Sequence, residues 1–156
     1  MTEHLLLWLF VIDLGIVLGA GLYEARISVP RWIASPAAAQ PGWHPDEATR
    51  DDTGRRFWGF TTTGPLTLLT IRNLWAAWHS SGAVQPWWWV AGLAALGDRV
   101  LTFSYFIPRM IRLMRLADSS ESRELATKWA NLNWLRQAFV LVAWVAALQA
   151  LTRFGA

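Results

Sequence analysis

The sequence predicts an all-α integral membrane protein, with four transmembrane helices in one bundle and one long first loop. Hydrophobic residues make up 54% of the 156 residues and charged residues only 16%, which is little charge for a soluble protein. Twelve residues are tryptophan, a side chain that gathers at membrane–water interfaces. The apolar residues fall in four stretches long enough to cross a bilayer. The chain length fits a single domain, residues 1–156.

The first predicted span covers about residues 5–24. No Lys or Arg precedes it, so it lacks the basic start of a signal peptide and is expected to stay uncleaved. Gly15 and Gly19 form a small-residue stripe that suits close helix packing. Asp13 lies in the middle of this span and Glu24 closes it.

A long loop, residues 26–56, is predicted to follow. Prolines interrupt it from Pro30 onward, which opposes one continuous helix there. The loop is longer than a helix connection needs. Trp32 and Trp43 predict that part of it lies on the membrane surface.

The second and third spans cover about residues 57–78 and 87–108, with a short uncharged turn between them. Pro65 lies in the first turns of the second span, where a proline is tolerated and bends the helix. Pro86 fits the start of the third helix.

The fourth span, about residues 131–151, begins with the most informative stretch of the chain. Trp129, Asn133 and Arg136 are spaced i, i+4 and i+7, so they share one helix face. Polar groups at the mouth of a membrane helix either reach water or meet a partner. One interpretation is an interfacial anchor, with the indole among the headgroups and Arg136 reaching to the surface. The other is a site or a structural clamp shared with other helices.

Charge predicts the orientation of the chain. Ten of the eleven Lys and Arg residues that flank the spans lie in the two long connections. The positive-inside rule therefore places both connections in the cytoplasm and both termini outside. We assign the protein to the bacterial inner (plasma) membrane, with the lipid bilayer as its partner. No nucleic-acid-binding motif is present in the sequence.

One layer of polar residues is predicted near the loop side of the bundle. Glu24 ends the first span, Tyr105 lies near the end of the third, and Asn133 and Arg136 open the fourth. Two alternatives explain such a layer. One is a structural Glu24–Arg136 ion pair, and the other is a pocket for a polar or aromatic molecule that enters from the bilayer.

A second polar layer is predicted deeper, with Asp13, Arg72, Asp98 and Arg99. Lone charges there would be costly, so we expect ion pairs between helices. Adjacent residues on a helix point about 100° apart, so Asp98 and Arg99 are expected to find different partners. A proton path through this layer is the alternative.

The sequence predicts no metal and no bound cofactor. It contains no cysteine, which excludes disulfides, thiolate catalysis and Cys-based metal sites. His4 and His79 are expected at one interface, and His44 stands beside acidic residues, but neither arrangement has a metal-binding spacing motif.

Two groups of residues resemble the anthrone-oxygenase-like family. Thr102, Tyr105 and Pro108 precede a charged connection and then the Trp129, Asn133 and Arg136 spacing. The first helix, which ends Gly21-Leu22-Tyr23-Glu24 with Pro30 and Trp32 beyond, is also similar. Members are small four-helix membrane proteins, and some are associated with cofactor-independent oxygenation of anthrones to anthraquinones.

The resemblance implies a membrane oxygenase that acts on a lipophilic aromatic substrate. Arg136 would stabilise a substrate anion, and Asn133 or Tyr105 would donate hydrogen bonds to it. Glu24 would be the candidate base. The alternative is a non-catalytic membrane protein that binds a lipid, a small molecule or a partner protein, or that assembles into a homo-oligomer.

Overall fold

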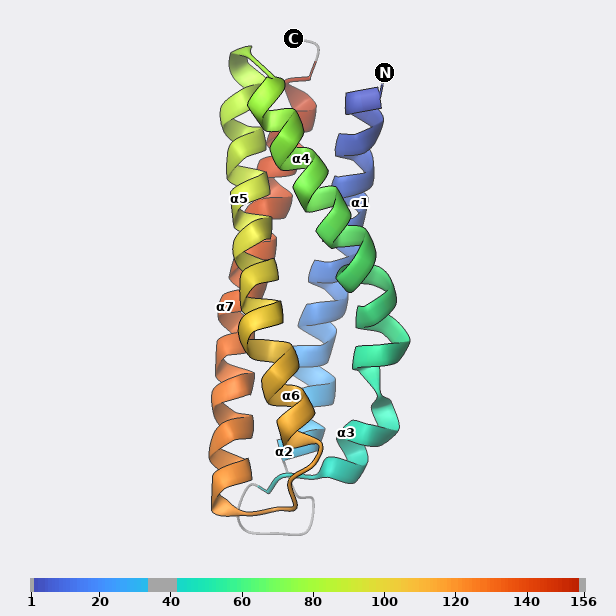
Figure 1. The fold of residues 1–156 in the computed structure, drawn as a ribbon, viewed down its shortest axis with the longest axis vertical. Coiled ribbons are helices and arrows are strands. Elements are labelled where there is room, and N and C mark those ends of the chain that lie inside the picture. Colours follow the sequence, from blue (N-terminus) through green and yellow to red (C-terminus); the bar gives the residue numbers. More distant parts are fainter. Residues whose placement is uncertain (1, 34–41, 155–156) are drawn as a thin grey trace.

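A computed structural model describes residues 2–33 and 42–154, which are almost entirely helical and contain no strand. Four long helical runs lie side by side in alternating directions (Figure 1). The runs are α1 (Thr2–Tyr23), η1 (Glu24–Ser28) and α2 (Val29–Ile33); η2 (Gly54–Leu66) and α4 (Thr67–His79); α5 (Gln85–Leu101), η4 (Thr102–Phe106) and α6 (Ile107–Leu113); and α7 (Ser120–Thr152). Two short helices, α3 (Pro45–Asp51) and η3 (Gly82–Val84), lie in the connections.

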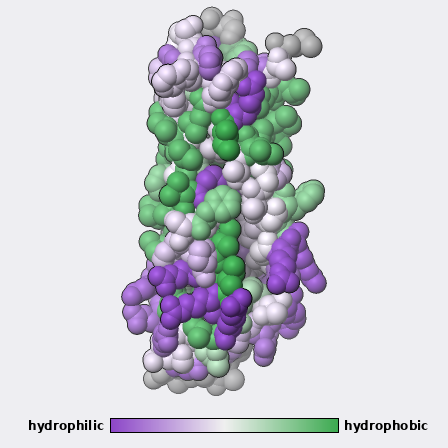
Figure 2. Space-filling model, in the orientation of Figure 1, coloured by the Kyte–Doolittle hydropathy of each residue, from purple (hydrophilic) through white to green (hydrophobic). Residues whose placement is uncertain are grey.

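Three of these runs are long and apolar enough to cross a membrane: Thr2–Ile33, Gly82–Leu113 and Ser120–Thr152. The second run is less apolar, because Arg55 and Arg56 and several threonines lie in its first half. Figure 2 shows an apolar band between two hydrophilic ends. Such a band, with large apolar side chains on its outer surface, is typical of a membrane protein.

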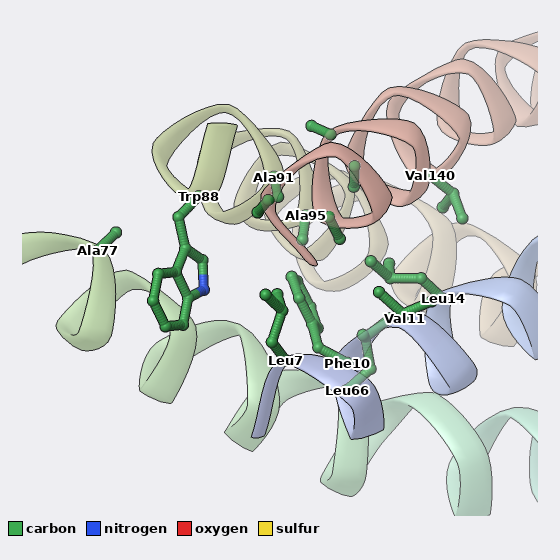
Figure 3. Packing of buried hydrophobic residues seen from close by; sticks show 14 of the residues in the cluster. Leu7, Phe10, Val11, Leu14, Leu66, Ala77, Trp88, Ala91, Ala95 and Val140 are labelled. Atoms are coloured by element: carbon green, nitrogen blue, oxygen red, sulfur yellow. The ribbon is translucent and has the colours of Figure 1, made fainter. Parts of the chain in front are cut away.

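The upper core is the cluster of buried apolar residues in the half of the bundle where α1 begins and α7 ends. Small residues bring the helices close together there. A side chain at Gly92 of α5 would place its Cβ 2.7 Å from Leu74 of α4. Trp88 is buried beside them, and its indole N–H donates to Asn73 Oδ1 at 2.7 Å. Figure 3 shows the apolar residues of this core, which include Leu7, Phe10, Leu14, Ala91, Ala95 and Val140.

A second core, the loop-end core, lies at the opposite end of the bundle, where α2, α3, α6 and the first turns of α7 meet. Trp32 and Trp43, which the sequence predicted to lie on the membrane surface, are only 1% and 2% exposed. Each indole N–H has an acceptor inside this end of the protein: Asp51 Oδ2 at 2.9 Å for Trp32 and the Leu113 carbonyl at 3.0 Å for Trp43. The surface prediction was therefore wrong, because these internal acceptors remove the cost of burying an indole.

The predicted loop over residues 26–56 is also largely wrong in the part that the structure describes. The first helix continues through Pro30 to Ile33, and residues 45–51 form α3. A wide turn precedes Pro30, in which the Val29 N–H donates to the Glu24 carbonyl five residues earlier. This wide turn accommodates the proline ring, which an ordinary α-helical turn does not. Residues 34–41 lie outside the described residues.

The four predicted spans all coincide with helical runs. Each span, 5–24, 57–78, 87–108 and 131–151, lies within one run. The runs extend beyond the spans, mainly at the loop end, where α2, α6 and the first turns of α7 surround the second core.

Candidate functional site

A cavity of about 110 Å³ lies where three of the helical runs are locally widened. The widened segments are the π-helices η1, η2 and η4, and each contributes residues to the cavity wall. π-Helical turns are rare and are frequent at functional sites. The polar and aromatic residues of the wall are Glu24, Trp32, Thr53, Trp58, Thr62, Thr63, Thr102, Phe106, Trp129 and Arg136.

Glu24 is buried in this wall and both of its carboxylate oxygens have partners. Oε1 accepts hydrogen bonds from Thr53 Oγ1 at 2.7 Å and from the Trp58 indole N–H at 2.8 Å. Oε2 lies 3.8 Å from Nη2 of Arg136. Two donors and a guanidinium around one carboxylate form the environment that an ionised carboxylate requires.

Arg136 lies opposite Glu24 and is 9% exposed. Its guanidinium carbon lies 5.3 Å from the ring centre of Trp58 and 5.0 Å from that of Phe106, within the range of cation–π attraction. The 3.8 Å approach to Glu24 is longer than a hydrogen bond. Within residues 2–33 and 42–154 the guanidinium makes no direct hydrogen bond, so its donors remain available to a molecule in the cavity.

Asn133 is the most completely buried of the predicted site residues. Its exposure is 0%, and neither side-chain atom has a hydrogen-bond partner among the described residues. It lies one helical turn from Arg136 on the same face of α7, and both side chains are buried.

Tyr105 does not belong to this cavity. It is half-buried. Its ring centre lies 5.4 Å from that of Phe106, with the rings edge-on, and 5.7 Å from the guanidinium carbon of Arg109. It is absent from the cavity wall. Of the predicted site residues, Glu24 and Arg136 thus line the cavity, whereas Asn133 and Tyr105 do not. Thr102 and Phe106 carry the inward face of η4.

The interfacial-anchor interpretation of Trp129 and Arg136 does not fit the structure. Trp129 is 6% exposed, and its indole N–H donates to the Phe106 carbonyl at 3.2 Å. Trp134, on the outer face of α7, is 50% exposed and has the position that an interfacial anchor needs.

A layer of buried polar atoms without partners lies behind the cavity. The Trp129–Phe106 hydrogen bond, and the packing of Phe139 over Gly97, set α7 antiparallel to α5 and η4. In this register Asp98 and Thr102 lie at the same height in the bundle as Gln137 and Asn133. The atoms that lack a hydrogen-bond partner in the described part of the chain are Asp98 Oδ1, Thr102 Oγ1, both side-chain atoms of Asn133, and Gln137 Oε1.

The predicted separation of Asp98 and Arg99 was wrong. Asp98 Oδ2 accepts from both Nε, at 3.0 Å, and Nη2 of Arg99. The third donor, Nη1, reaches the Thr62 carbonyl of η2 at 3.0 Å. The arginine stem is long enough to fold back onto its neighbour while the far side of the guanidinium contacts another helix.

The predicted partners of Arg72 and Asp13 were also wrong. Arg72 is 46% exposed and pairs with Glu3 at 3.5 Å, near the end of the bundle where α1 begins. It reaches that interface because only about two helical turns separate it from the end of α4. Asp13 has a buried Oδ2 without a partner in the described residues.

His4 and His79 have aromatic rather than metal-binding surroundings. The His4 ring centre lies 5.2 Å from that of Phe154. His79 stacks on Trp75 at 4.2 Å, and its Nδ1 lies 2.8 Å from the Trp75 carbonyl. In residues 2–33 and 42–154 there is no group of three or more His, Asp or Glu residues that could hold a metal ion.

Sequence reasoning missed Thr53, Trp58 and Gln137. The first two hold Glu24 from a segment that was predicted to be loop or the start of a span. The third packs against Gly21 of α1, where an added Cβ would meet its amide at 2.3 Å. The signal in the sequence that could have identified Gln137 is its polar amide directly before the apolar stretch of α7.

No family model matches the chain, and no curated protein or solved structure matches it. The resemblance to the anthrone-oxygenase-like family therefore stays a prediction.

Proposed function

We propose that this is a four-span membrane protein that binds a small lipophilic molecule bearing an anionic oxygen, in the cavity at Arg136. The observation that carries the proposal is the state of that arginine. It is buried, it lies against two aromatic rings, and within the described residues it makes no direct hydrogen bond. A planar guanidinium is suited to grip a carboxylate or phenolate with two parallel hydrogen bonds.

The size and walls of the cavity favour an aromatic head group. Trp58, Phe106 and Trp129 supply ring faces and edges around the guanidinium. A dry apolar cavity of about 150 Å³ holds benzene, so the smaller cavity of about 110 Å³ would take up one ring only with part of that ring in its mouth. The exposed Gly54 and Thr63 mark a mouth between η2 and the third run, through which an alkyl tail would extend.

A matched pair of ligands tests this proposal. 4-Butylbenzoate and 4-butylbenzamide differ in charge but share ring and tail. A charge-assisted hydrogen bond contributes about 1.5–3 kcal/mol, so we expect the purified protein to bind the benzoate at least about tenfold more tightly in calorimetry. Arg136→Gln should remove this preference, and the exposed Arg112→Gln should retain it. Equal affinities for the two ligands in the wild-type protein would contradict the proposal.

Oxygenation of an anthrone is the second candidate function. It is favoured by the motif resemblance together with the adjacent positions of Glu24 and Arg136 in the wall of one cavity. Glu24 would remove a proton from the activated carbon of the anthrone, and Arg136 would stabilise the resulting anion. Molecular oxygen would oxidise that anion, so that anthrone and O₂ give anthraquinone and water. Three fused rings require the mouth to widen, because the cavity takes up only part of one ring.

Conversion of anthrone under air tests the enzymatic candidate. The expected result is anthraquinone formation with one oxygen atom from labelled O₂, faster than without protein and lost in Glu24→Gln. A rate that is unchanged by this substitution would rule out the catalytic role of Glu24.

A further inference from the structure

The cavity at Arg136 adjoins a buried cluster of four charges that cancel. Glu24 and Asp98 are negative, Arg99 and Arg136 are positive, and all four are at most 9% exposed. The charge of Arg136 interacts with those of Glu24, Asp98 and Arg99. A formally neutral cluster of this kind is the arrangement expected away from water.

An anion bound at Arg136 would disturb this balance. It would add one negative charge to a cluster that has no excess positive charge. An uncompensated charge in such a site is costly, and proteins commonly avoid that cost by changing the protonation of a neighbouring group. A proton that enters together with the anion would restore neutrality.

The hydrogen bonds identify the group that can take this proton. Both oxygens of Glu24 already face donors or a guanidinium. Asp98 Oδ2 is held by Arg99, but Oδ1 is buried and receives no hydrogen bond in the described residues. On α7, both side-chain atoms of Asn133 and Gln137 Oε1 also lack a partner among the described residues. Asp98 Oδ1 can carry a proton without displacing a donor, which neither oxygen of Glu24 can.

The surroundings of Asp98 contain one other candidate. Asp98 pairs with Arg99 on its own helix, and its charge also acts on that of Arg136 on α7, as does the charge of Glu24 on η1. On α1, Asp13 lies near Arg99, and its Oδ2 is buried without a partner in the described residues. Asp13 is absent from the cavity wall and its charge is not among those that act on Arg136, so it is less directly coupled to an anion at Arg136.

We propose that an anion binds at Arg136 together with one proton, which Asp98 takes up, so that the site admits anion and proton as a neutral pair. The inference rests on the proposed function, because it requires an anionic ligand in the cavity. It adds a proton requirement that would make ligand affinity depend on pH.

Calorimetry with 4-butylbenzenesulfonate tests the coupling, because this anion stays charged at every pH used. Measurements in two buffers of different ionisation enthalpy give the number of protons taken up, and we expect one for each anion. Uptake of one proton lowers the affinity about tenfold for each unit that the pH rises. Asp98→Asn resembles the protonated carboxyl, so it should bind the anion with no proton uptake and no pH dependence. Asp13→Asn is the matched control and should keep both.

The outcomes separate the two proposals. Binding by the wild-type protein without proton uptake would overturn the coupling and leave the proposed function intact. Uptake that persists in Asp98→Asn, or that is lost in Asp13→Asn, would overturn the assignment to Asp98. Failure of both the sulfonate and the benzoate to bind would overturn the proposed function and the coupling with it. If Asp98→Asn does not fold, the proton count of the wild-type protein still decides whether coupling exists.

Discussion

Arg136 illustrates how the surroundings of one side chain distinguish a binding group from a membrane anchor. An arginine that anchors a helix needs only a flexible stem and a charge that reaches the headgroups. Here the guanidinium is buried between the rings of Trp58 and Phe106 and faces Glu24. Its planar shape fits between these groups, which an ammonium would not reproduce.

Arg136→Lys is therefore expected to abolish the preference for 4-butylbenzoate over its amide. The charge remains, but the two-pronged hydrogen bond and the stacking are lost. Binding is measured by calorimetry, and the melting temperature in detergent is measured alongside. The exposed Arg31→Lys is the control and should change neither. A variant that binds both ligands as the wild type does would show that only the charge matters.

At this scale the sequence predicted the approach of Glu24 to Arg136 and the burial of Asn133. It did so because the end of one span and the start of another fall at the same depth. It could not predict Thr53 and Trp58 as partners of Glu24. Their positions depend on how the first connection folds back, and that follows from long-range contacts rather than from local pattern.

At the scale of elements, periodicity predicted helices but not their π-helical segments. Pro65 lies within η2, and Pro30 is the second residue of α2, just beyond the end of η1. Proline removes a donor and crowds the carbonyl four residues before it, which favours a locally widened helix. No proline marks η4 from within, since Pro108 lies in α6 just beyond it. The coincidence of all three segments at one cavity appears only in the fold.

Gly92 is expected to set the distance between α4 and α5. In Gly92→Ala the new methyl group would lie 2.7 Å from Leu74 Cδ2 and 3.0 Å from its Cγ. Overpacking of this kind costs about 1–3 kcal/mol, which a reduced unfolding free energy in detergent would reveal. Gly19→Ala is the matched control, because nothing lies within 4 Å of its added Cβ. An equal loss in both variants would show that helix contact is not the cause.

Asp118 forms hydrogen bonds that join the connection before α3 to the connection between α6 and α7. Its Oδ1 accepts from the Trp43 backbone N–H at 2.8 Å and from Arg123 Nε at 2.9 Å. The hydrogen bonds from Arg123, followed by that from Trp43, hold the pKa of Asp118 below its usual range. A carboxyl with a lowered pKa stabilises the fold above its ordinary pKa, and this contribution is lost as the pH falls through the lowered value.

Asp118→Asn is expected to loosen the segment around Trp43 at neutral pH. Amide hydrogen exchange of a peptide covering residues 42–48 measures this, and the rate should rise several-fold. Because the pKa of Asp118 is lowered, the wild-type segment should stay protected on mild acidification and loosen only in strong acid. Asp46→Asn, an exposed carboxylate on α3, is the control. Unchanged exchange in Asp118→Asn would refute the role of these hydrogen bonds.

On the scale of the whole molecule, α7 connects the upper core and the loop-end core. Its 33 residues span about 50 Å, against about 30 Å for the hydrocarbon of a bilayer. The apolar part of α7 packs in the upper core, and its first turns pack on Trp32 and Trp43 in the loop-end core. The cavity lies between the two cores, because its wall includes Trp58, which packs on the upper core, and Trp32 and Trp129 of the loop-end core.

The last prediction concerns the number of membrane crossings. Three runs meet the length and hydropathy that a span requires, whereas the run η2–α4 is more polar. Nevertheless α4 packs against both α1 and α5 over the same part of the bundle. The first and last helices also meet at one end, where the His4 ring lies 5.2 Å from Phe154. We therefore predict that this fourth run crosses the bilayer together with the three apolar runs.

An even number of crossings puts both termini on one side, and an odd number puts them on opposite sides. Reporters are attached before Thr2, after Ala156, within the turn at Gly82 and at the exposed Ala117. We expect export-dependent reporters to be active at both termini and at Gly82, and inactive at Ala117, because ten of the eleven flanking Lys and Arg residues lie in the other two connections. Termini on opposite sides would show that η2–α4 does not cross. Termini together in the cytoplasm would keep the four crossings but reverse the orientation, which would mean that the arginines of these connections do not set the topology.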